Sequence, residues 1–247
     1  MILKRVTDSL RRQDWTAVAI EFLLVLVGVL LAFQINEWAS EHDAKKERSA
    51  AAQRLLLEAE ETVAFFRLGV AAQQRLNDDL SYAISNVKPG GWAEADQKRM
   101  TQGLARALEM TTPGPPSSVY DDLVSSGAFG EIGDPQMRTA VARYNATLKF
   151  HRESVEYLRQ SLPRLDQFEA LSYTFDPAKR RAGLIVDFAK LEKDQLLKEE
   201  LALAANAQTI ALVLRQRNLK RAIEMCQEIG RIAGQPCRLD RPAPSFD

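Results

Sequence analysis

The hydrophobic pattern of this chain is dominated by one stretch close to the N-terminus. Residues 17–35 form a nearly unbroken apolar run in which only Glu21 and Gln34 are strongly polar, and Trp15 and Trp38 stand on either side of it. If the run is helical, the two tryptophans lie roughly 34 Å apart, which matches the hydrocarbon core of a bilayer with its interfaces. The pattern predicts a transmembrane helix over residues 17–36.

A cleaved signal peptide is the alternative interpretation of this run. Lys4, Arg5, Arg11 and Arg12 would then be the charged region before an apolar core. The run is longer than such a core usually is, and residues 34–38 offer no small-x-small cleavage site. We therefore expect an uncleaved membrane anchor.

The charges on either side of the run indicate its orientation. Four basic residues precede it, whereas Glu37, Glu41 and Asp43 follow it, although Lys45, Lys46 and Arg48 come soon afterwards. The positive-inside rule then predicts that residues 1–16 are cytoplasmic. If the cell is Gram-negative, the expected location is the bacterial inner membrane, spanned once, with residues 37–235 forming a periplasmic domain and residues 236–247 an irregular tail.

Beyond the anchor the pattern is that of long helices. Residues 36–87 contain no proline and a single glycine, Gly69, so the transmembrane helix is expected to continue outward. Positions that alternate by three and four residues form a heptad seam, typical of a coiled coil or of a long helix in a bundle. The seam consists of Leu56, Ala59, Val63, Phe66, Val70, Gln73, Asn77, Leu80, Ile84 and Val87.

The rest of the chain shows four further helices. We expect them over residues 93–110, over residues 118–126 with Ser118 and Asp121 as a capping box, from Asp134-Pro135 to a kink or end at Pro163, and over about 194–232. No stretch shows sustained alternation, so no sheet is expected. The predicted fold class is all-α: a single N-terminal transmembrane helix continuing into an extracytoplasmic bundle of long helices.

Charge and cysteine content narrow the possible functions. Lysine and arginine total 33, and so do aspartate and glutamate. The chain therefore has no excess of positive charge that would favour binding of nucleic acid. Cys226 and Cys237 are the only cysteines, which excludes a disulfide-dense scaffold and a cysteine-based zinc site. In an oxidising compartment these two can form a disulfide, and two unpaired thiols are the alternative.

Two segments carry a resemblance to a known family. The anchor from Glu21 to Trp38, ending in Gln34-Ile35-Asn36-Glu37-Trp38, and the segment from Tyr120 through Ser126-Gly127 to Asp134-Pro135 and Tyr144 resemble a bacterial family of single-pass membrane proteins. That family is defined by a domain of unknown function. The resemblance therefore implies a location and an architecture, and it implies no activity. In the second segment, turn chemistry explains Ser125, Ser126 and Gly127 as a helical hairpin, and an anion-binding nest is the alternative.

Glu21 is the sharpest functional candidate, because an ionisable side chain inside a span is costly and indicates a function by default. Three interpretations are open: an interfacial residue that reaches the headgroups, a contact with a partner span, and a proton relay. Gly28 and Ala32 form a small-xxx-small pair compatible with close helix contact. We assign the anchor residues as Trp15, Glu21, Gly28, Ala32, Gln34, Asn36 and Trp38.

Five polar residues interrupt the apolar stripes of the expected outer helices. They are Gln73, Asn77, His151, Gln208 and Arg215. If the long helices share a core, these side chains form a buried polar layer, which would either bind a small ligand or fix the register of the helices. The alternative is that they face water at the ends of the helices.

The sequence contains no motif for an enzyme. A nucleophile elbow, a phosphate loop, a metalloprotease His-Glu-x-x-His and a dinucleotide-binding glycine pattern are all missing, and His42 and His151 are isolated. We therefore expect no enzyme, no cofactor and no metal. The expected function is a membrane-anchored scaffold or sensor-like protein that contacts the lipid bilayer and self-associates through its seam or binds another envelope protein. An accessory subunit of a proton-driven membrane complex that uses Glu21 is the alternative.

Overall fold

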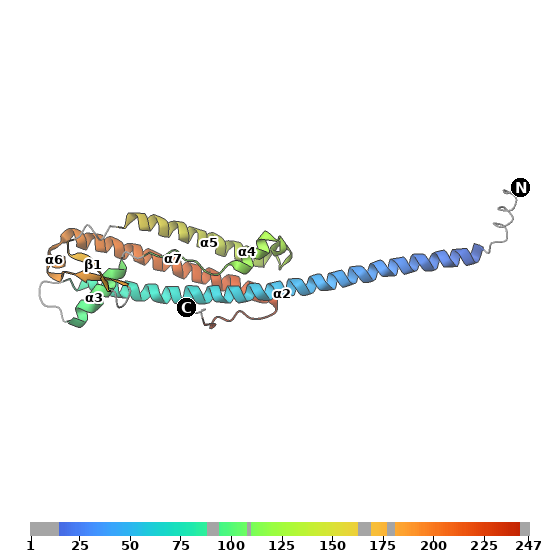
Figure 1. The fold of residues 1–247 in the computed structure, drawn as a ribbon, viewed down its shortest axis with the longest axis horizontal. Helices are drawn as coiled ribbons and strands as arrows, with labels where there is room; N and C mark the ends of the chain where they lie inside the picture. The colour runs from blue at the N-terminus through green and yellow to red at the C-terminus, as the bar shows by residue number, and fades with distance from the viewer. Residues whose placement is uncertain (1–14, 88–93, 108–109, 163–168, 177–180, 243–247) are drawn as a thin grey trace. The chain divides into compact units, whose positions relative to one another are not determined.

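The computed structural model describes residues 15–87, 94–107, 110–162, 169–176 and 181–242. Most of these residues are helical, and the chain divides into two compact units, residues 1–50 and 51–247. The elements drawn in Figure 1 are, in order, α2 (Trp15–Ser85), α3 (Glu94–Ala107), α4 (Ser118–Ser125), the 3-10 helix η1 (Ala128–Glu131), α5 (Pro135–Ser161), β1 (Leu171–Asp176), β2 (Arg181–Val186), α6 (Phe188–Lys193) and α7 (Gln195–Ala233).

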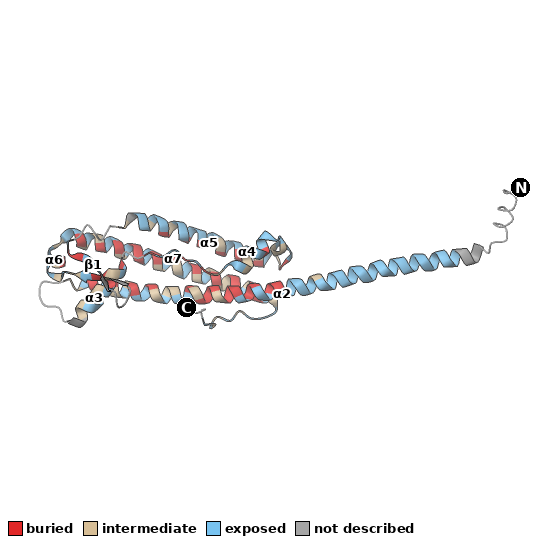
Figure 2. Ribbon diagram, in the orientation of Figure 1, coloured by how far each residue is buried: buried red, intermediate tan, exposed pale blue. Residues whose placement is uncertain are grey.

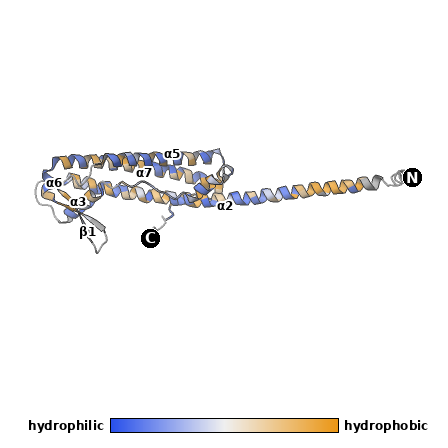
Figure 3. Ribbon diagram, turned by 45° about the horizontal axis from the view of Figure 1, so that its top comes forward, coloured by the Kyte–Doolittle hydropathy of each residue, from blue (hydrophilic) through white to orange (hydrophobic). Residues whose placement is uncertain are grey.

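The described part of the first unit is the N-terminal portion of α2. Residues 19–43 of this helix are exposed throughout, as Figure 2 shows. Figure 3 colours much of the same stretch as hydrophobic, and its most apolar window of 18 residues has a mean hydropathy of 2.2 with no residue buried. By length and composition, this helix is able to span a membrane.

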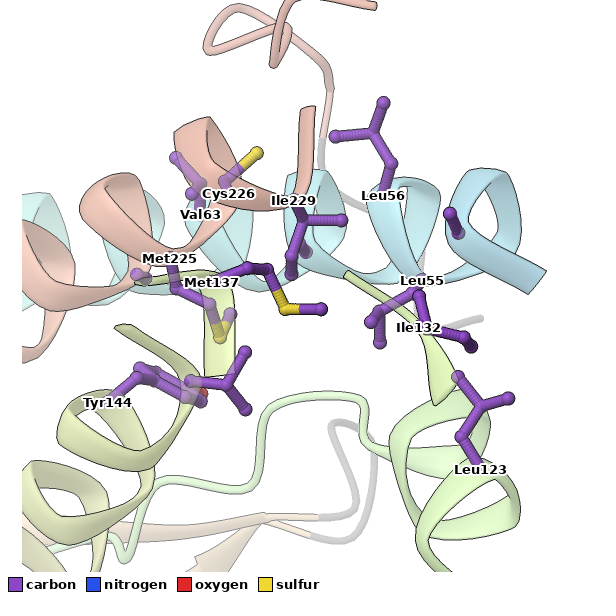
Figure 4. Packing of buried hydrophobic residues seen from close by; sticks show 14 of the residues in the cluster. Leu55, Leu56, Val63, Leu123, Ile132, Met137, Tyr144, Met225, Cys226 and Ile229 are labelled. Carbon is purple, nitrogen blue, oxygen red and sulfur yellow. The ribbon is translucent and has the colours of Figure 1, made fainter. Parts of the chain in front are cut away.

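In the second unit, the part of α2 after Ala50 packs alongside α5 and α7 (Figure 1). Buried side chains from these three helices and from α4 form one hydrophobic cluster, part of which is seen in Figure 4. Its members include Leu55, Leu56, Val63 and Phe66 of α2, Leu123 of α4, Met137, Val141, Tyr144 and Leu148 of α5, and Met225, Cys226 and Ile229 of α7. Full burial of such side chains contributes about 1.5–3 kcal/mol each, so this cluster is a main source of stability.

A second hydrophobic cluster lies at the far end of α2. It joins Leu80 and Ala83 of α2 to α3, the two strands, α6 and the start of α7. A third, smaller cluster places Met110 against Val155 of α5 and Ala211 of α7. The three clusters together follow α2 and α7 along most of the second unit.

The predicted seam of α2 is the side that enters these clusters. Leu56, Ala59, Val63, Phe66 and Leu80 are buried, and Val70, Asn77, Ile84 and Val87 are half-buried. Their partners are other helices of the same chain. The seam is therefore occupied within the molecule and does not present a free surface to a second copy.

The expectation that the chain has no sheet is wrong. β1 and β2 form an antiparallel hairpin in which Leu171 pairs with Val186 and Tyr173 with Leu184. Each strand has six residues. Leu171 and Leu184 are buried and Tyr173 and Ile185 are exposed, so few positions carry the inward-outward alternation that sequence patterns reveal. At the coarser level the all-α prediction agrees with the predominance of helices.

The ends of α5 and α7 follow the predicted helix signals. Asp134 is the N-cap of α5, its carboxylate accepts the Met137 amide at 2.9 Å, and Pro135 is the first helical residue. The helix ends at Ser161, before Pro163. Asp194 caps the start of α7 in the same way, and Gly234 ends it with a left-handed backbone conformation (φ 70°).

The capping box expected at Ser118 is not formed. Ser117 is the N-cap of α4, and its hydroxyl donates to the Asp121 carboxylate at 2.9 Å. The amides of Val119 and Tyr120 instead donate to Glu58 of α2, at 2.6 and 3.0 Å. A side chain sixty residues away in sequence thus replaces the local cap, which no local pattern could reveal.

The Ser-Gly segment after α4 forms the expected turn. The hydroxyls of Ser125 and Ser126 both donate to the carbonyl oxygen of Asp122, at 3.0 and 2.8 Å. Gly127 has a left-handed backbone conformation (φ 76°), which an L-residue rarely adopts. In this structure the segment is therefore a turn that ends α4 and leads into η1.

Gly103 of α3 allows close contact between α3 and α2. A Cβ at this position would lie 2.5 Å from the carbonyl oxygen of Asp79 and 3.0 Å from the amide nitrogen of Leu80. Backbone atoms cannot move aside as a flexible side chain can. The two helices therefore approach this closely only because residue 103 has no side chain.

We predict that Gly103→Ala lowers the free energy of unfolding by about 1–3 kcal/mol, the usual cost of overpacking, even though alanine favours helix by about 1 kcal/mol. Thermal unfolding of the detergent-purified chain, followed by circular dichroism, measures the change. Gly114→Ala is the control, because nothing lies within 4 Å of a Cβ at Gly114. Equal stability of the two variants would contradict the close contact.

Candidate functional site

Two glutamines form the centre of a buried polar network between α2 and α7. Gln73 and Gln208 are almost fully buried, and Nε2 of Gln73 donates to Oε1 of Gln208 at 2.8 Å. Nε2 of Gln208 donates in turn to the carbonyl oxygen of Ala107, at 2.7 Å. Asn77 joins the network, because its Oδ1 accepts from Gln73 at 3.1 Å. The amide groups are thus turned toward one another and toward the end of α3.

Arg215 extends this network to the segment that follows α3. Its Nε donates to Oε1 of Gln73 at 3.3 Å, and its Nη2 donates to the carbonyl and hydroxyl oxygens of Thr111, at 3.3 and 3.0 Å. Burial lowers the pKa of the Arg215 guanidinium from its ordinary value. A Cβ on Gly69 would lie 3.1 Å from Nη1, so the absence of a side chain at Gly69 makes room for this group.

His151, the fifth residue of the expected layer, has a different partner. Its ring is fully buried, and its Nδ1 lies 2.6 Å from Nδ2 of Asn218 on α7. The same amide nitrogen donates to the carbonyl oxygen of Leu214 at 2.9 Å. The nitrogen of Asn218 therefore faces the ring, so Nδ1 accepts and the proton of the neutral ring is assigned to Nε2.

Burial keeps His151 neutral at physiological pH. Desolvation, together with the nearby positive charge of Arg215, lowers the pKa of His151 to about 4. The structure thus brings Gln73, Asn77, Gln208 and Arg215 together in one hydrogen-bonded network, and it places His151 beside Asn218 within the electrostatic influence of that network.

Sequence reasoning missed Asn218 because the predicted stripe of α7 was too narrow. The stripe that the sequence predicts for this helix is the single row Leu201, Ala205, Gln208, Leu212, Arg215, Leu219, Ala222, Cys226 and Ile229. Of these, Leu212 and Leu219 are only half-buried. α7 packs against both α2 and α5, so a second row is buried, and it contains Ala204, Ala211, Asn218 and Met225 at intervals of seven residues. A search for two parallel heptad rows would have found it.

A second polar site joins α2 to the C-terminal tail. Glu60 is 1% exposed, and its carboxylate accepts from the backbone amide of Arg238 and from the guanidinium of Arg241, both at 2.9 Å. Burial alone would raise the pKa of Glu60, but these hydrogen bonds hold it below its ordinary value. Glu60 is adjacent to the seam position Ala59, so the seam pattern gave no sign of it.

Cys226 and Cys237 form a disulfide in the structure, with Cα atoms 5.7 Å apart. The bond closes the turn between the end of α7 and the tail. Gly230 permits this turn, because a Cβ there would lie 2.6 Å from the carbonyl oxygen of Gln235. The disulfide and Glu60 together fasten residues 235–241 beside α7 and α2.

The assigned anchor residues from Glu21 to Trp38 lie on the exposed part of α2. Glu21, Gly28 and Ala32 are spaced by seven and four residues, which places them on one side of the helix. Trp38 stacks on His42 with ring centroids 5.6 Å apart. Gln34 and Asn36 lie on the same exposed stretch, and the side chain of Trp15 is outside the described part of the chain.

The cavity at the hydrophobic cluster is too small for a metabolite. It has a volume of about 40 Å³ and lies between α2, α5 and α7, beneath Pro115 and Pro116. That volume holds a few water molecules, whereas ligand pockets measure about 300–1,000 Å³. Tyr144 borders it, and burial raises the pKa of the tyrosine above its ordinary value.

A larger, open groove of about 470 Å³ lies between α5 and α7 and includes Arg143, Glu224 and Glu228. Among the residues that the structure describes, no group of three His, Cys, Asp or Glu side chains could hold a metal ion.

Comparison of the chain with protein-family models, with curated proteins and with solved structures finds no match. The resemblance noted in the sequence therefore stays a prediction.

We predict that His151 makes the stability of the protein depend on pH. Its pKa is about 4 in the folded state and about 6.5 when unfolded, so the neutral ring contributes stability that is fully present above pH 6.5 and is lost as the pH falls toward 4. Between pH 7 and pH 5 the expected loss is about 2 kcal/mol.

Chemical denaturation of the detergent-purified chain at both pH values measures this loss, and His151→Gln is expected to remove it. His42→Gln is the matched control, since His42 lies on the exposed stretch of α2. Other titrating groups contribute equally to all three proteins. An unchanged pH dependence in His151→Gln would show that the ring is not buried in its neutral form.

We predict that breaking the disulfide destabilises the domain. Cys226 and Cys237 are 11 residues apart, and closing a loop of this length contributes roughly 2–3 kcal/mol in the chain-entropy model. The double variant Cys226→Ser/Cys237→Ser should lower the unfolding free energy by that amount and should not respond to a reductant. A wild-type protein that is equally insensitive to the reductant would contradict this prediction.

Proposed function

We propose that this chain is a single-pass membrane protein whose helical domain acts outside the cytoplasm by binding another protein and not by catalysis. The apolar, unburied N-terminal stretch of α2 supports the anchor. The basic residues before it support a cytoplasmic N-terminus. We propose that the span lies in a bacterial inner membrane and the helical domain in the periplasm. The lipid bilayer is then the first partner of the chain.

The observation that carries the proposed binding role is a second apolar stripe on α7. Leu196, Leu203 and Ile210 are seven residues apart and are 61%, 59% and 38% exposed, and Val213 continues the stripe at 47%. Each of the first three directly precedes a buried residue, so the stripe lies about 100° around the helix from the core. The fold does not bury these side chains, although exposing them to water is unfavourable.

α5, which packs along α7, also exposes large apolar side chains. Phe150 and Tyr157 are 52% and 73% exposed and are again seven residues apart. Heptad spacing of exposed apolar residues is the pattern by which one helix binds another. This favours a helical partner, either a second copy or another envelope protein. The surface proposed to bind it is then the outer side of α7 and not the seam of α2.

The buried polar groups support binding rather than chemistry. Gln73 and Gln208 hydrogen-bond to each other and to a nearby backbone carbonyl, and Arg215 donates to this network through Nε and to Thr111 through Nη2, as in a group that fixes the register of packed helices. The fully buried His151 is held neutral by its surroundings. We infer that this layer positions α7 and with it the outer stripe.

We predict that a photo-cross-linking amino acid at position 203 captures a protein partner in intact membranes. The same residue at position 202 is the matched control, because Ala202 is also exposed but lies about 100° away on α7. A discrete product from position 203 alone, lost on Ile210→Lys at unchanged abundance, supports the proposal. Its mass distinguishes a second copy from another protein. No product, or equal products from both positions, would overturn it.

Glu21 favours a second candidate function, that of an accessory subunit in a proton-driven membrane complex. Its carboxylate lies in the apolar stretch on the same side of α2 as Gly28 and Ala32, where a neighbouring span could approach. Glu21→Gln in the same cross-linking experiment separates the two candidates. Loss of a cross-linked multi-span partner in Glu21→Gln, at unchanged abundance of the chain, favours the proton-driven complex. An unchanged cross-linked product from position 203 favours the contact made by the outer domain.

A further inference from the structure

Three arginines from two helices converge on the short segment between α3 and α4. Nε of Arg152 donates to the carbonyl oxygen of Pro113 at 3.1 Å. Nη2 of Arg159 donates to the carbonyl oxygen of Met110 at 3.0 Å and to the Thr112 hydroxyl at 3.2 Å. Arg215 reaches Thr111 from α7, as described above. Residues 110–113 therefore lie within a cluster of positive charge.

Within residues 110–162 and 181–242, the positive charge of this cluster is only partly neutralised by paired carboxylates. Glu156 pairs with Arg159 at 3.1 Å. Within the described part of the chain, no carboxylate forms an ion pair with Arg152 or Arg215. Among the residues that the structure describes here, three guanidinium groups and one paired carboxylate carry a charge of +2, and Arg215 carries its charge in a half-buried position. An uncompensated cation that is partly withdrawn from water favours binding of an anion.

Hydrogen-bond donors remain at the same place. The hydroxyls of Thr111 and Thr112 each accept from an arginine, so each has its own hydrogen left to donate. Both threonines are exposed. Arg152 hydrogen-bonds through Nε only, and its two terminal nitrogens make no hydrogen bond to the described residues. Hydroxyl and guanidinium donors together are suited to an oxyanion with several acceptor oxygens.

We propose that Arg152, Arg215, Thr111 and Thr112 form a binding site for a phosphate monoester or for inorganic phosphate. A phosphate dianion matches the charge of +2, whereas a carboxylate would leave the cluster with a net positive charge. Its tetrahedral oxygens accept from several donors at once, as guanidinium groups prefer. The site is separate from the outer stripe of α7 and does not depend on the proposed partner.

The test uses the full-length chain in a maltoside detergent, which contains no phosphorus. Inorganic phosphate is titrated and the width of its ³¹P resonance is followed. We expect saturable broadening with a Kd on the order of 1 mM at low ionic strength, weakening as salt is added. Arg152→Gln is expected to weaken binding about tenfold, since it removes a charged donor at an exposed position.

Controls separate this site from general electrostatic attraction. Arg217→Gln removes the same charge from an exposed position of α7 and should leave binding unchanged. Thr112→Val should weaken binding without a change in net charge. Broadening that does not saturate, or that is equal in the wild type, Arg152→Gln and Thr112→Val, would overturn the proposal, and so would competition by acetate as strong as that by phosphate.

Competition by a soluble short-chain phosphatidic acid then distinguishes the source of the phosphate group. Displacement of inorganic phosphate at lower concentration than glycerol 3-phosphate indicates a lipid headgroup. Equal displacement by the two indicates a small phosphorylated solute. Either result supports a phosphate site, and only the chemistry attached to the phosphate group differs.

Discussion

Burial of the α2 seam is the constraint on which the rest of the second unit depends. A helix with a continuous apolar seam cannot leave that seam in water, and here α5 and α7 cover it from within the same chain. Because α7 contacts both α2 and α5, its buried surface is wider than a single stripe. The apolar residues that α7 still exposes are not part of this core. We therefore attribute them to binding and not to folding.

The same constraint explains why the polar layer lies where it does. Gln73 occupies a seam position, so burying the seam removes this side chain from water and obliges its amide to find partners. Gln208 and Asn77 accept from this amide at 2.8 and 3.1 Å, and Gln208 in turn donates to the carbonyl oxygen of Ala107 at 2.7 Å. A shift of α7 by one turn would leave these groups unpaired, at a cost of about 1–3 kcal/mol for each group. The layer thus restricts α2 and α7 to one register.

Periodic and local signals in the sequence predicted the helices well. They did not predict contacts between residues far apart in the sequence, nor the β-hairpin. The seam of α2, the Asp134-Pro135 start of α5 and the extent of α7 each follow from spacing or from a capping residue. Gln73 and Gln208 were found because they interrupt a stripe. Glu58 and Glu60 could not be found, since their partners are 60 to 181 residues away and their acidic character is ordinary for a helix surface. The hairpin escaped because six-residue strands carry too little alternation.

The segment between α3 and α4 shows how side chains replace secondary structure. It contains three prolines, which lack an amide hydrogen, so its carbonyls cannot all be satisfied by a regular backbone pattern. Long polar side chains of α5 and α7 take that role. Arg159 donates to the carbonyl of Met110 and Arg152 to that of Pro113, and Gln208 donates to the carbonyl of Ala107 at the end of α3. A neutral donor such as glutamine would also satisfy a carbonyl, with a weaker hydrogen bond. The use of three arginines therefore exceeds what the segment requires, and the excess positive charge beside two exposed hydroxyls is what favours an anion at this place.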